Sequence, residues 1–295
     1  MTQRPLAGVI GGSGLYDMEA LEDAREVTMD TPFGPPSDAF VLGRIGDTPV
    51  AFLARHGRGH RLLPSEVNYR ANIHAMKQLG VRYLISVSAV GSLAPDRAPL
   101  DLVLPDQFID LTKRRETSFF GDGVVAHVSM AQPVCHAVRE VLASAIAATP
   151  GAQERQLHRQ GTYVCIEGPH FSSLAESRWY QAMGGHIIGM TNMPEAKLAL
   201  EAQIAYASLA MITDYDCWHP HEENVSADLA LRNLLSNAAL AQQVVARAVA
   251  MLGSERPASH AFDALRTALV TPRERMPAHR LAALEPLLSD KEHAS

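Results

Sequence analysis

Cysteine is scarce in this sequence. Only three cysteines occur in 295 residues, and no two of them form a Cys-x-x-Cys pair. An odd number of widely spaced cysteines argues against both a disulfide framework and a thiolate zinc site. We therefore expect Cys135, Cys165 and Cys217 to be buried free thiols in a reducing cytoplasm.

A surplus of basic charge and a long apolar run are also missing. The chain has 26 basic and 32 acidic residues, a formal net charge of −6, which disfavours a nucleic-acid-binding surface. No stretch of 18 apolar residues without a charge occurs, so we expect no membrane span. The N-terminus lacks the apolar core of a signal peptide, and we interpret it as native and unprocessed. The prediction is a cytoplasmic globular protein.

What the sequence does contain is an alternation of strand-like and helix-like segments. Apolar runs stopped by glycine or by polar clusters predict strands, and amphipathic stretches with caps predict helices; the first helix would begin at an N-cap, Ser65, and end at Gly80. This alternation predicts an α/β domain over residues 1–252, with a twisted mixed or mainly parallel sheet flanked by helices. Residues 253–295, with four prolines and clustered charges, are expected to form a surface tail of short helices that frays at its end.

Polar clusters follow five of the predicted strands. Ligands of open α/β sheets bind beyond the carboxyl ends of the strands, so these five loops are expected to converge on one pocket. The clusters are GGSG (11–14), RHGRGH (55–60), SAVGS (88–92), MTNMPE (190–195) and DYD (214–216).

The glycine-rich loop GGSG matches no nucleotide fingerprint. The third glycine of a dinucleotide motif is absent, and so is the lysine of a P-loop. The remaining interpretations are a plain turn, or a backbone that approaches an anion closely with the Ser13 hydroxyl beside it.

The basic cluster RHGRGH allows three interpretations. His56 and His60 have the spacing of a helical metal pair, but Gly57 and Gly59 disfavour a helix, and no third ligand follows in register. A solvated surface loop is the second interpretation. The third is a phosphate clamp in which Arg55 supplies a planar charged fork and His56 an adjacent donor.

Two later motifs carry carboxylates. Glu167, in EGPHF, could accept hydrogen bonds from a sugar or a base, and Phe171 could stack on a ring; a structural turn is equally compatible. Asp214 and Asp216 end a very apolar strand, where mutually raised pKa values would keep one of them protonated as a general acid. Calcium or magnesium binding here, and a metal site in CWHPH, lack the ligand spacing that those ions need.

Taken together and in order, these motifs resemble the trimeric purine nucleoside phosphorylases, and within them the branch that acts on 5′-methylthioadenosine. The resemblance spans about residues 6–250 and is carried by GVIGGSGLYD, LARHGRGHRLLPSEVNYRANI, IEGPHFSSLAES, GMTNMPEAKLA and TDYDCWHPHEE. It implies a sheet with a barrel-like core and phosphorolysis of a purine nucleoside to the base and a ribose 1-phosphate. It also implies no metal or organic cofactor, and a homotrimer, or a dimer of trimers, with active sites between subunits.

The resemblance also implies roles for individual residues. Phosphate would be bound by Ser13, Arg55, His56, Ser88, Ala89 and Thr191. Met190 would lie under the ribose and Phe171 would line the base pocket, while His127 from a neighbouring subunit and Leu231 would close the pocket for the 5′-substituent. Asp214 and Asp216 would recognise the purine and protonate its N7 atom.

An aspartate at position 214 implies a preference for adenine. A protonated carboxyl can donate to N7 while its other oxygen accepts from the 6-amino group, whereas 6-oxo purines present an acceptor there. The sequence departs from the family pattern at His170, Asn192, Ala227 and Ala230; the small side chains of Ala227 and Ala230 predict a roomier 5′ pocket that admits adenosine or longer thioethers. A hydrolytic nucleosidase, a broader nucleoside phosphorylase and a non-catalytic nucleoside-binding protein remain alternatives.

Overall fold

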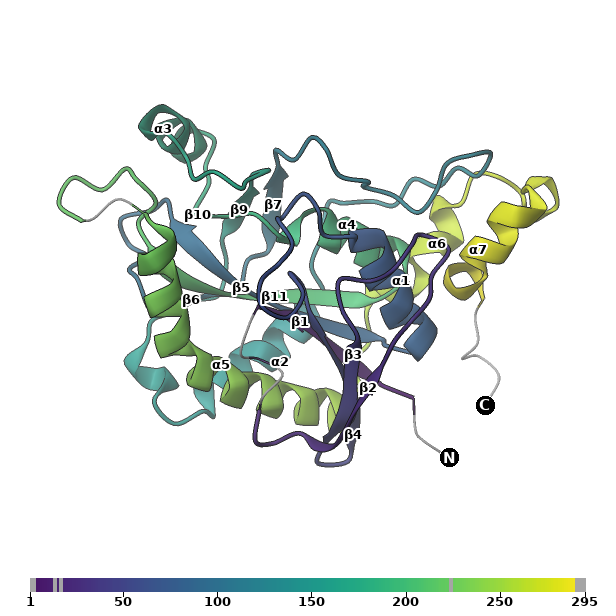
Figure 1. The fold of residues 1–295 in the computed structure, drawn as a ribbon, viewed down its shortest axis with the longest axis horizontal. Coiled ribbons are helices and arrows are strands. Elements are labelled where there is room, and N and C mark those ends of the chain that lie inside the picture. Colours follow the sequence, from purple (N-terminus) through teal and green to yellow (C-terminus); the bar gives the residue numbers. More distant parts are fainter. Residues whose placement is uncertain (1–3, 13–14, 16–17, 223–224, 290–295) are drawn as a thin grey trace.

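A twisted mixed β-sheet forms the centre of the protein (Figure 1). The computed structural model describes residues 4–12, 15, 18–222 and 225–289, without the side chains of 227, 229–231 and 234–237. The strands are β1 (Ala7–Gly11), β2 (Glu22–Val27), β3 (Phe40–Ile45), β4 (Thr48–Ala54), β5 (Tyr83–Ser92), β6 (Leu102–Val103), β7 (Gln107–Asp110), β8 (Leu157–His158), β9 (Thr162–Cys165), β10 (Ile187–Gly189) and β11 (Ala205–Asp214).

The sheet branches at β5. Its main path runs β2-β3-β4-β1-β5-β10-β9-β7, and β11 also pairs with β5 and continues to β6 and β8. The pairs β1–β4, β1–β5 and β5–β11 are parallel, whereas β10 runs antiparallel to β5. The predicted α/β class with a mixed, twisted sheet is confirmed.

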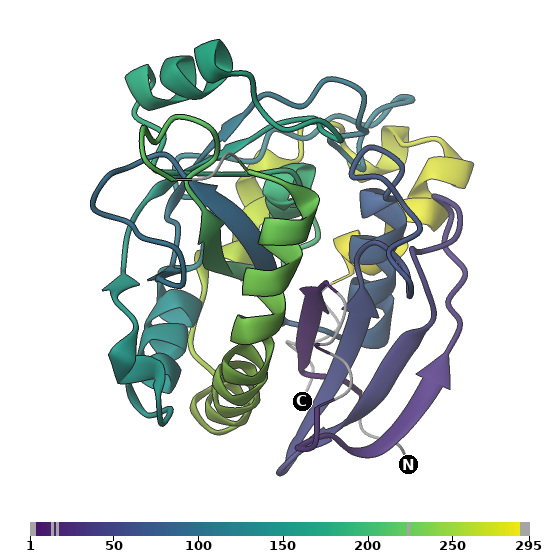
Figure 2. The same ribbon diagram turned by 60° about the vertical axis from the view of Figure 1, so that its left-hand side comes forward.

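Helices cover both faces of this sheet (Figure 2). On one face α2 and α5 pack against each other and against β11; on the other, α1 and α4 pack together, with α7 against α1 and α6 against α4. The helices are α1 (Tyr69–Leu79), α2 (His136–Ala147), α3 (Leu174–Ala182), α4 (Asn192–Glu201), α5 (Ala227–Glu255), α6 (Ala264–Ala268) and α7 (Ala278–Leu288), with short 3-10 turns at Ala152–Glu154, His260–Asp263 and Arg273–Arg275.

Side chains of the two central strands, β5 and β11, point alternately to the two faces of the sheet. On β11, Ala207 and Leu209 join the apolar cluster under α2 and α5, whereas Tyr206 and Ala210 join the cluster under α1 and α4. Successive side chains of a strand point to opposite faces, so a strand buried on both sides must be apolar throughout. All ten residues of β11 are buried, which is why the sequence shows an unbroken apolar run there.

Two local predictions need correction. The first helix begins at Tyr69, not after Ser65, because the side chain of Asn68 accepts the backbone N–H of Ala71 and caps it; its predicted end at Gly80 is confirmed by a left-handed φ of 101°. Strand β2 was not predicted, because its sequence EDAREV is charged and almost wholly exposed at the sheet edge. Lone charged edge strands lack the apolar alternation on which a strand prediction depends.

The segment after residue 252 contributes to the core. Leu284 and Leu287 of α7 are fully buried in the apolar cluster that α1 and α4 form, and Leu265 and Met276 join the same cluster. The side chain of Gln203, which follows α4, donates to the carbonyl of Leu287 at 3.0 Å. This segment therefore covers one face of the domain, in yellow beside α1 in Figure 1.

Candidate functional site

Four parallel strands, β1, β4, β5 and β11, point toward the same end of the sheet. Gly11 at the end of β1 pairs with Ala54 at the end of β4, and Ile10 pairs with Ser86 of β5. Farther along β5, Gly91 pairs with Asp214 at the end of β11. The ends of β1 and β4 therefore lie together beside the middle of β5, and the end of β11 lies beside the end of β5, so that all four strands lead toward the same end of the sheet, as the sequence predicts.

Arg55 follows β4 directly and lies in the interior, with a side chain only 2% exposed. Its guanidinium forms a bidentate ion pair with Glu195 of α4, Nε to Oε2 at 2.8 Å and Nη2 to Oε1 at 3.1 Å. It also donates to Ser86 Oγ at 2.7 Å and to the Val87 carbonyl at 3.1 Å. Burial by itself would lower the pKa of Arg55, but Glu195 raises it above its ordinary value, so the guanidinium stays charged.

His56 is buried and neutral. Burial, and then the charge of Arg55, lower the pKa of His56 to about 4. Its Nδ1 atom lies 2.9 Å from the carbonyl of Leu62, which makes Nδ1 the protonated nitrogen of the neutral ring. The ring stacks face to face on His60, with centroids 4.3 Å apart. This stacking does not have the geometry of two histidines sharing a metal ion.

The end of β5 brings an unsatisfied hydroxyl to the same region. Ser88 is buried, and its Oγ has no hydrogen-bond partner in the described part of the protein. Ala89 is half-buried beside it. Strand β10 runs antiparallel to β5, with Ile188 opposite Gly91, so its continuation leads toward Ala89 and Ser88. Met190 and Thr191 lie in that continuation, half-buried and buried respectively.

The two aspartates of DYD end β11 as buried acids. Burial, and to a lesser extent the nearby Asp216, raise the pKa of Asp214 to about 6, against hydrogen bonds from Thr213 and from the Asp216 backbone that lower it. These hydrogen bonds, Thr213 Oγ1 to Oδ2 and Asp216 N to Oδ1, measure 2.7 and 2.8 Å. Burial also raises the pKa of Asp216, whose Oδ2 has no partner among the described residues. Its φ of 54° is strained for a non-glycine residue, as is common at functional sites.

The loop after Asp216 joins two other parts of the site. The thiol of Cys217 donates to the carbonyl of Ser172 at 3.3 Å, which places the EGPHFSS loop beside DYD. The indole of Trp218 donates to the carbonyl of Ser92 at 2.7 Å, at the end of β5. Phe171, expected to line a base pocket, is 42% exposed on this loop. An exposed aromatic side chain on the loop that contacts Cys217 is compatible with that role.

Of the other predicted residues, His127 lies away from this site in its own chain, and two fall outside what the structure describes. His127 is exposed on another part of the chain, where its backbone N–H donates to Ala268 at 2.8 Å. A residue supplied to a neighbouring subunit would lie away from its own site in this way. Ser13 lies outside the described residues, and Leu231 lies in α5 with its side chain outside the described part.

Two functional neighbours were missed from the sequence. Glu195, the ion-pair partner of Arg55, lies in the first turn of α4, where acidic residues are common. The only sequence feature that could have indicated its role is the apolar sequence around it. Arg115 has a side chain 1% exposed and donates to the carbonyls of Met190, Met193 and Glu167. Its Nε also binds Glu167 Oε1 at 3.0 Å. The carboxylate of Glu167 is therefore occupied by the protein, not left for a sugar or a base as was considered.

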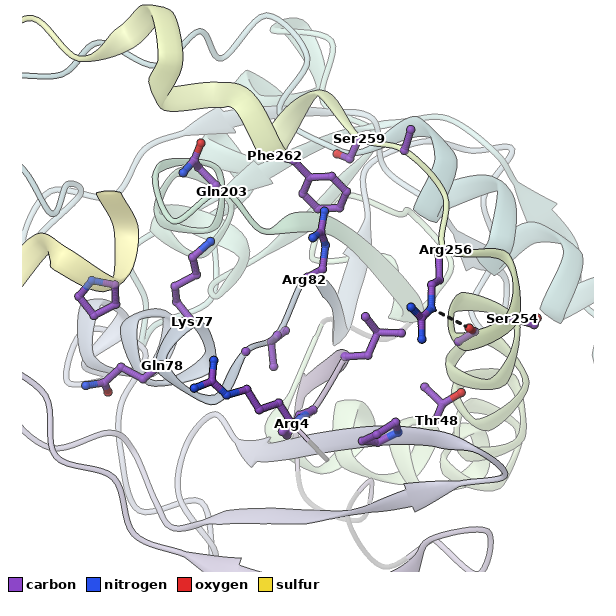
Figure 3. Close-up of a pocket in the computed structure, with 18 of the residues that line it drawn as sticks. Arg4, Thr48, Lys77, Gln78, Arg82, Gln203, Ser254, Arg256, Ser259 and Phe262 are labelled. Atoms are coloured by element: carbon purple, nitrogen blue, oxygen red, sulfur yellow. Dashed lines mark hydrogen bonds between the residues drawn. The ribbon is translucent and has the colours of Figure 1, made fainter. Parts of the chain in front are cut away.

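A separate cavity of about 1330 Å³ opens at the opposite edge of the sheet, at the beginnings of β1, β4 and β5 (Figure 3). Arg4, Lys77, Arg82 and Arg256 lie around it, and the Arg82 guanidinium stacks on the ring of Phe262 at 4.1 Å. Among the predicted site residues whose side chains the structure describes, none lines this cavity. In the described ranges we find no group of three or more His, Cys, Asp or Glu side chains placed to hold a metal ion, and no helix able to cross a membrane.

Comparison with known proteins identifies the family. Residues 7–250 match the model of the phosphorylase superfamily. The chain belongs to this superfamily. A curated superfamily relative, the S-methyl-5′-thioadenosine phosphorylase of Thermosynechococcus vestitus, is 56% identical over 282 residues, which cover 96% of this chain and 97% of the relative. The enzyme of the same name from Synechocystis is 54% identical and covers 98% and 88% of the two chains.

Solved structures of the superfamily agree with the fold. A methylthioadenosine phosphorylase from an antarctic soil metagenomic library superposes with a TM-score of 0.93, at 58% identity, over 97% of this chain and 100% of that one. The methylthioadenosine phosphorylase of Schistosoma mansoni, in complex with adenine, gives a TM-score of 0.80 at 38% identity, over 85% and 92% of the chains. The resemblance of the motifs to a phosphorylase family is thereby confirmed.

Proposed function

We propose that the protein catalyses the phosphorolysis of S-methyl-5′-thioadenosine to adenine and 5-methylthioribose 1-phosphate. It is thus a pentosyltransferase of purine and methionine salvage. The observation that carries this proposal is the pair of buried acids Asp214 and Asp216. They lie at the end of β11, toward the same end of the sheet as Arg55 and Ser88. Relatives above 50% identity over nearly the whole chain carry the name of this activity.

In the proposed reaction, phosphate attacks the sugar as the base leaves. One phosphate oxygen forms a bond to C1′, the C1′–N9 bond breaks, and its electron pair moves into the purine. Asp214 delivers a proton to N7, which makes adenine a better leaving group. Because positive charge develops on the sugar in the transition state, a phosphate held close to C1′ stabilises it. Ser88, Thr191, Arg55 and His56, with Ser13 and Ala89, hold that phosphate.

The raised pKa of Asp214 supports the choice of base. A carboxyl with a pKa of about 6 keeps a fraction protonated near neutral pH, so it can donate to N7. Its other oxygen accepts from the 6-amino group of adenine. Asp216, whose Oδ2 has no hydrogen-bond partner among the described residues, shares this recognition, while Met190 supports the ribose and Phe171 lines the base pocket.

The active unit we propose is a homotrimer, or a dimer of trimers, in the cytoplasm. His127 of one subunit and Leu231 of another complete the pocket for the 5′-methylthio group. The exposed position of His127, away from the acids of its own chain, supports an intersubunit role. Phosphate is a co-substrate and no metal or organic cofactor takes part, so treatment with a chelator is expected to leave the rate unchanged.

The decisive experiment measures adenine release from S-methyl-5′-thioadenosine with and without inorganic phosphate. We expect release to depend on phosphate and to be accompanied by equimolar 5-methylthioribose 1-phosphate. Turnover that ignores removal of phosphate would instead indicate a hydrolytic nucleosidase. Binding without turnover in either buffer would indicate a nucleoside-binding protein. A parallel panel with adenosine and methylthioinosine ranks the substrates.

A further inference from the structure

The ion pair between Arg55 and Glu195 is fully withdrawn from water. The two side chains are 2% and 1% exposed, and two hydrogen bonds of 2.8 and 3.1 Å hold the guanidinium and the carboxylate in one plane. The hydroxyl of Tyr206 donates to Glu195 Oε1 at 3.0 Å and fixes the carboxylate from the other side. A buried pair of this geometry keeps both charges, and its net charge is zero.

The guanidinium of Arg55 lies against the segments that the proposed function assigns to phosphate. The backbone N–H of Arg55 donates to the carbonyl of Gly11, the first residue of the glycine-rich loop, and the guanidinium donates to Ser86 and Val87, just before Ser88. A guanidinium has five N–H groups. Nε binds Glu195, Nη2 is shared among Glu195, Ser86 and the carbonyl of Ile10, and Nη1 donates to Val87, so among the described residues one N–H of Nη1 has no acceptor.

No other described residue assigned to phosphate adds charge. His56 is neutral, because burial and Arg55 lower its pKa to about 4, and its protonated Nδ1 is committed to the carbonyl of Leu62. Ser88 and Thr191 offer uncharged hydroxyls, and Ala89 offers only its backbone. The described part of the subsite therefore consists of uncharged hydrogen-bonding groups and one charged group, the guanidinium of Arg55. The charge of this guanidinium is balanced by Glu195.

We propose that Glu195 is a positioning residue that makes the phosphate subsite electrically neutral and orients the Arg55 fork, so that phosphate is held by directed hydrogen bonds and not by net charge. The inference rests on the proposed function. A neutral site binds the attacking phosphate and the sugar phosphate product without excess ground-state affinity, which favours release of the product. An uncancelled Arg55 would instead bind both anions more tightly.

The first test uses the wild-type protein and varies ionic strength. Interactions with a net charge weaken as salt screens them, whereas hydrogen bonds in a neutral site change little. We expect the KM for phosphate to change less than about twofold between 20 mM and 500 mM of an inert salt, an interval over which the screening length falls severalfold. A steep rise in this KM with salt would overturn the proposal. This measurement does not depend on the folding of any variant.

The second test compares Glu195→Gln with the wild type. Gln keeps the shape of the side chain and removes its charge, so Arg55 is left with an uncompensated positive charge. We expect the KM for phosphate to fall severalfold and to become salt-dependent, with a lower kcat as product release slows. Phosphate should also raise the Tm of the variant more than that of the wild type, because it supplies the missing anionic partner. A higher phosphate KM, or one without salt dependence, would contradict the inference.

Glu201→Gln is the matched control. Glu201 is also a buried acid of α4, but it accepts from Ser118 Oγ and the Phe119 backbone, both at 2.7 Å, away from Arg55. We expect this variant to lose stability with no change in phosphate KM or salt dependence. Equal shifts in both variants would mean a purely structural effect. If the wild type needs no phosphate at all, the proposed function itself fails; if it needs phosphate but shows the opposite salt behaviour, only the neutral subsite fails.

Discussion

Gly91 lies against the acid at the end of β11: a Cβ atom at this position would lie 2.8 Å from Oδ1 of Asp214 and 3.0 Å from Cγ2 of Ile188. Gly91 pairs with Asp214 across two parallel strands, so neither backbone can move aside without disturbing the sheet. The place of the candidate acid therefore depends on a neighbour that has no side chain.

Replacing Gly91 by alanine is expected to displace the carboxyl of Asp214. Small misplacements of reacting groups are costly, so we expect kcat/KM to fall about tenfold or more, with a modest loss of stability. Gly43→Ala is the control, because Gly43 is also a strand residue with a crowded Cβ position, 2.6 Å from Leu21 Cδ1, but lies on β3 away from the acids. It should lower Tm and leave kcat/KM unchanged; equal losses of activity would disprove the specific contact.

The raised pKa of Asp214 predicts a pH dependence with a definite sign. The protonated form donates to N7, so activity that depends on it is full below about pH 6 and declines as the pH rises through that value. The ratio of wild-type to Asp214→Asn kcat/KM cancels the ionisation of phosphate itself. This ratio should fall above about pH 6; a ratio that is flat between pH 5 and 8 would remove Asp214 from proton transfer.

Asp214→Asn should also change which base is accepted. The amide can donate to a 6-oxo group or to N7, but it carries no transferable proton for the leaving base. We expect the ratio of kcat/KM for methylthioadenosine over methylthioinosine to fall by about tenfold or more, the size of effect when a buried hydrogen bond is mismatched. An unchanged ratio would mean that the 6-substituent is read by another residue.

Arg115 is expected to be a main support of the ribose side of the site. Its side chain, only 1% exposed, donates to the carbonyls of Met190 and Met193 and pairs with the partly buried Glu167. Arg115→Met should destabilise the protein by about 3–5 kcal/mol, since Glu167 and the carbonyls lose their partner, and should raise the nucleoside KM. Arg273→Met, which removes an exposed pair with Glu285, should cost about 0–1 kcal/mol in the same denaturation experiment.

The intersubunit role of His127 can be tested by complementation. Asp214→Asn and His127→Ala proteins are expected to be impaired when purified separately. Co-expressed together, they should regain a fraction of wild-type kcat/KM, because a subunit with an intact Asp214 can receive an intact His127 from its neighbour. Separately folded proteins mixed at the moment of assay are the control. Activity that never exceeds the sum of the two variants would place His127 outside the neighbouring site.

Much of this protein can be read from the order of its residues. The alternation of elements, the cap at Gly80 and the polar loops after strands follow from local rules, because caps, turns and burial patterns depend on residues close in sequence. The same loops carry the family motifs, and matching strand ends bring them together by the geometry of a parallel sheet. Strand β2 was missed because an exposed edge leaves no apolar pattern.

Other features were decided only by tertiary structure. Arg55 and Glu195 are 140 residues apart, and nothing near either residue indicates that the arginine is buried and neutralised. Arg115 likewise looks like a surface cation until its carbonyl partners are known. A charge in the sequence has a fixed sign, but its effect on a ligand depends on burial and on the partner that folding supplies. The long-range ion pair between Arg55 and Glu195 is what distinguishes a neutral phosphate clamp from a positively charged one.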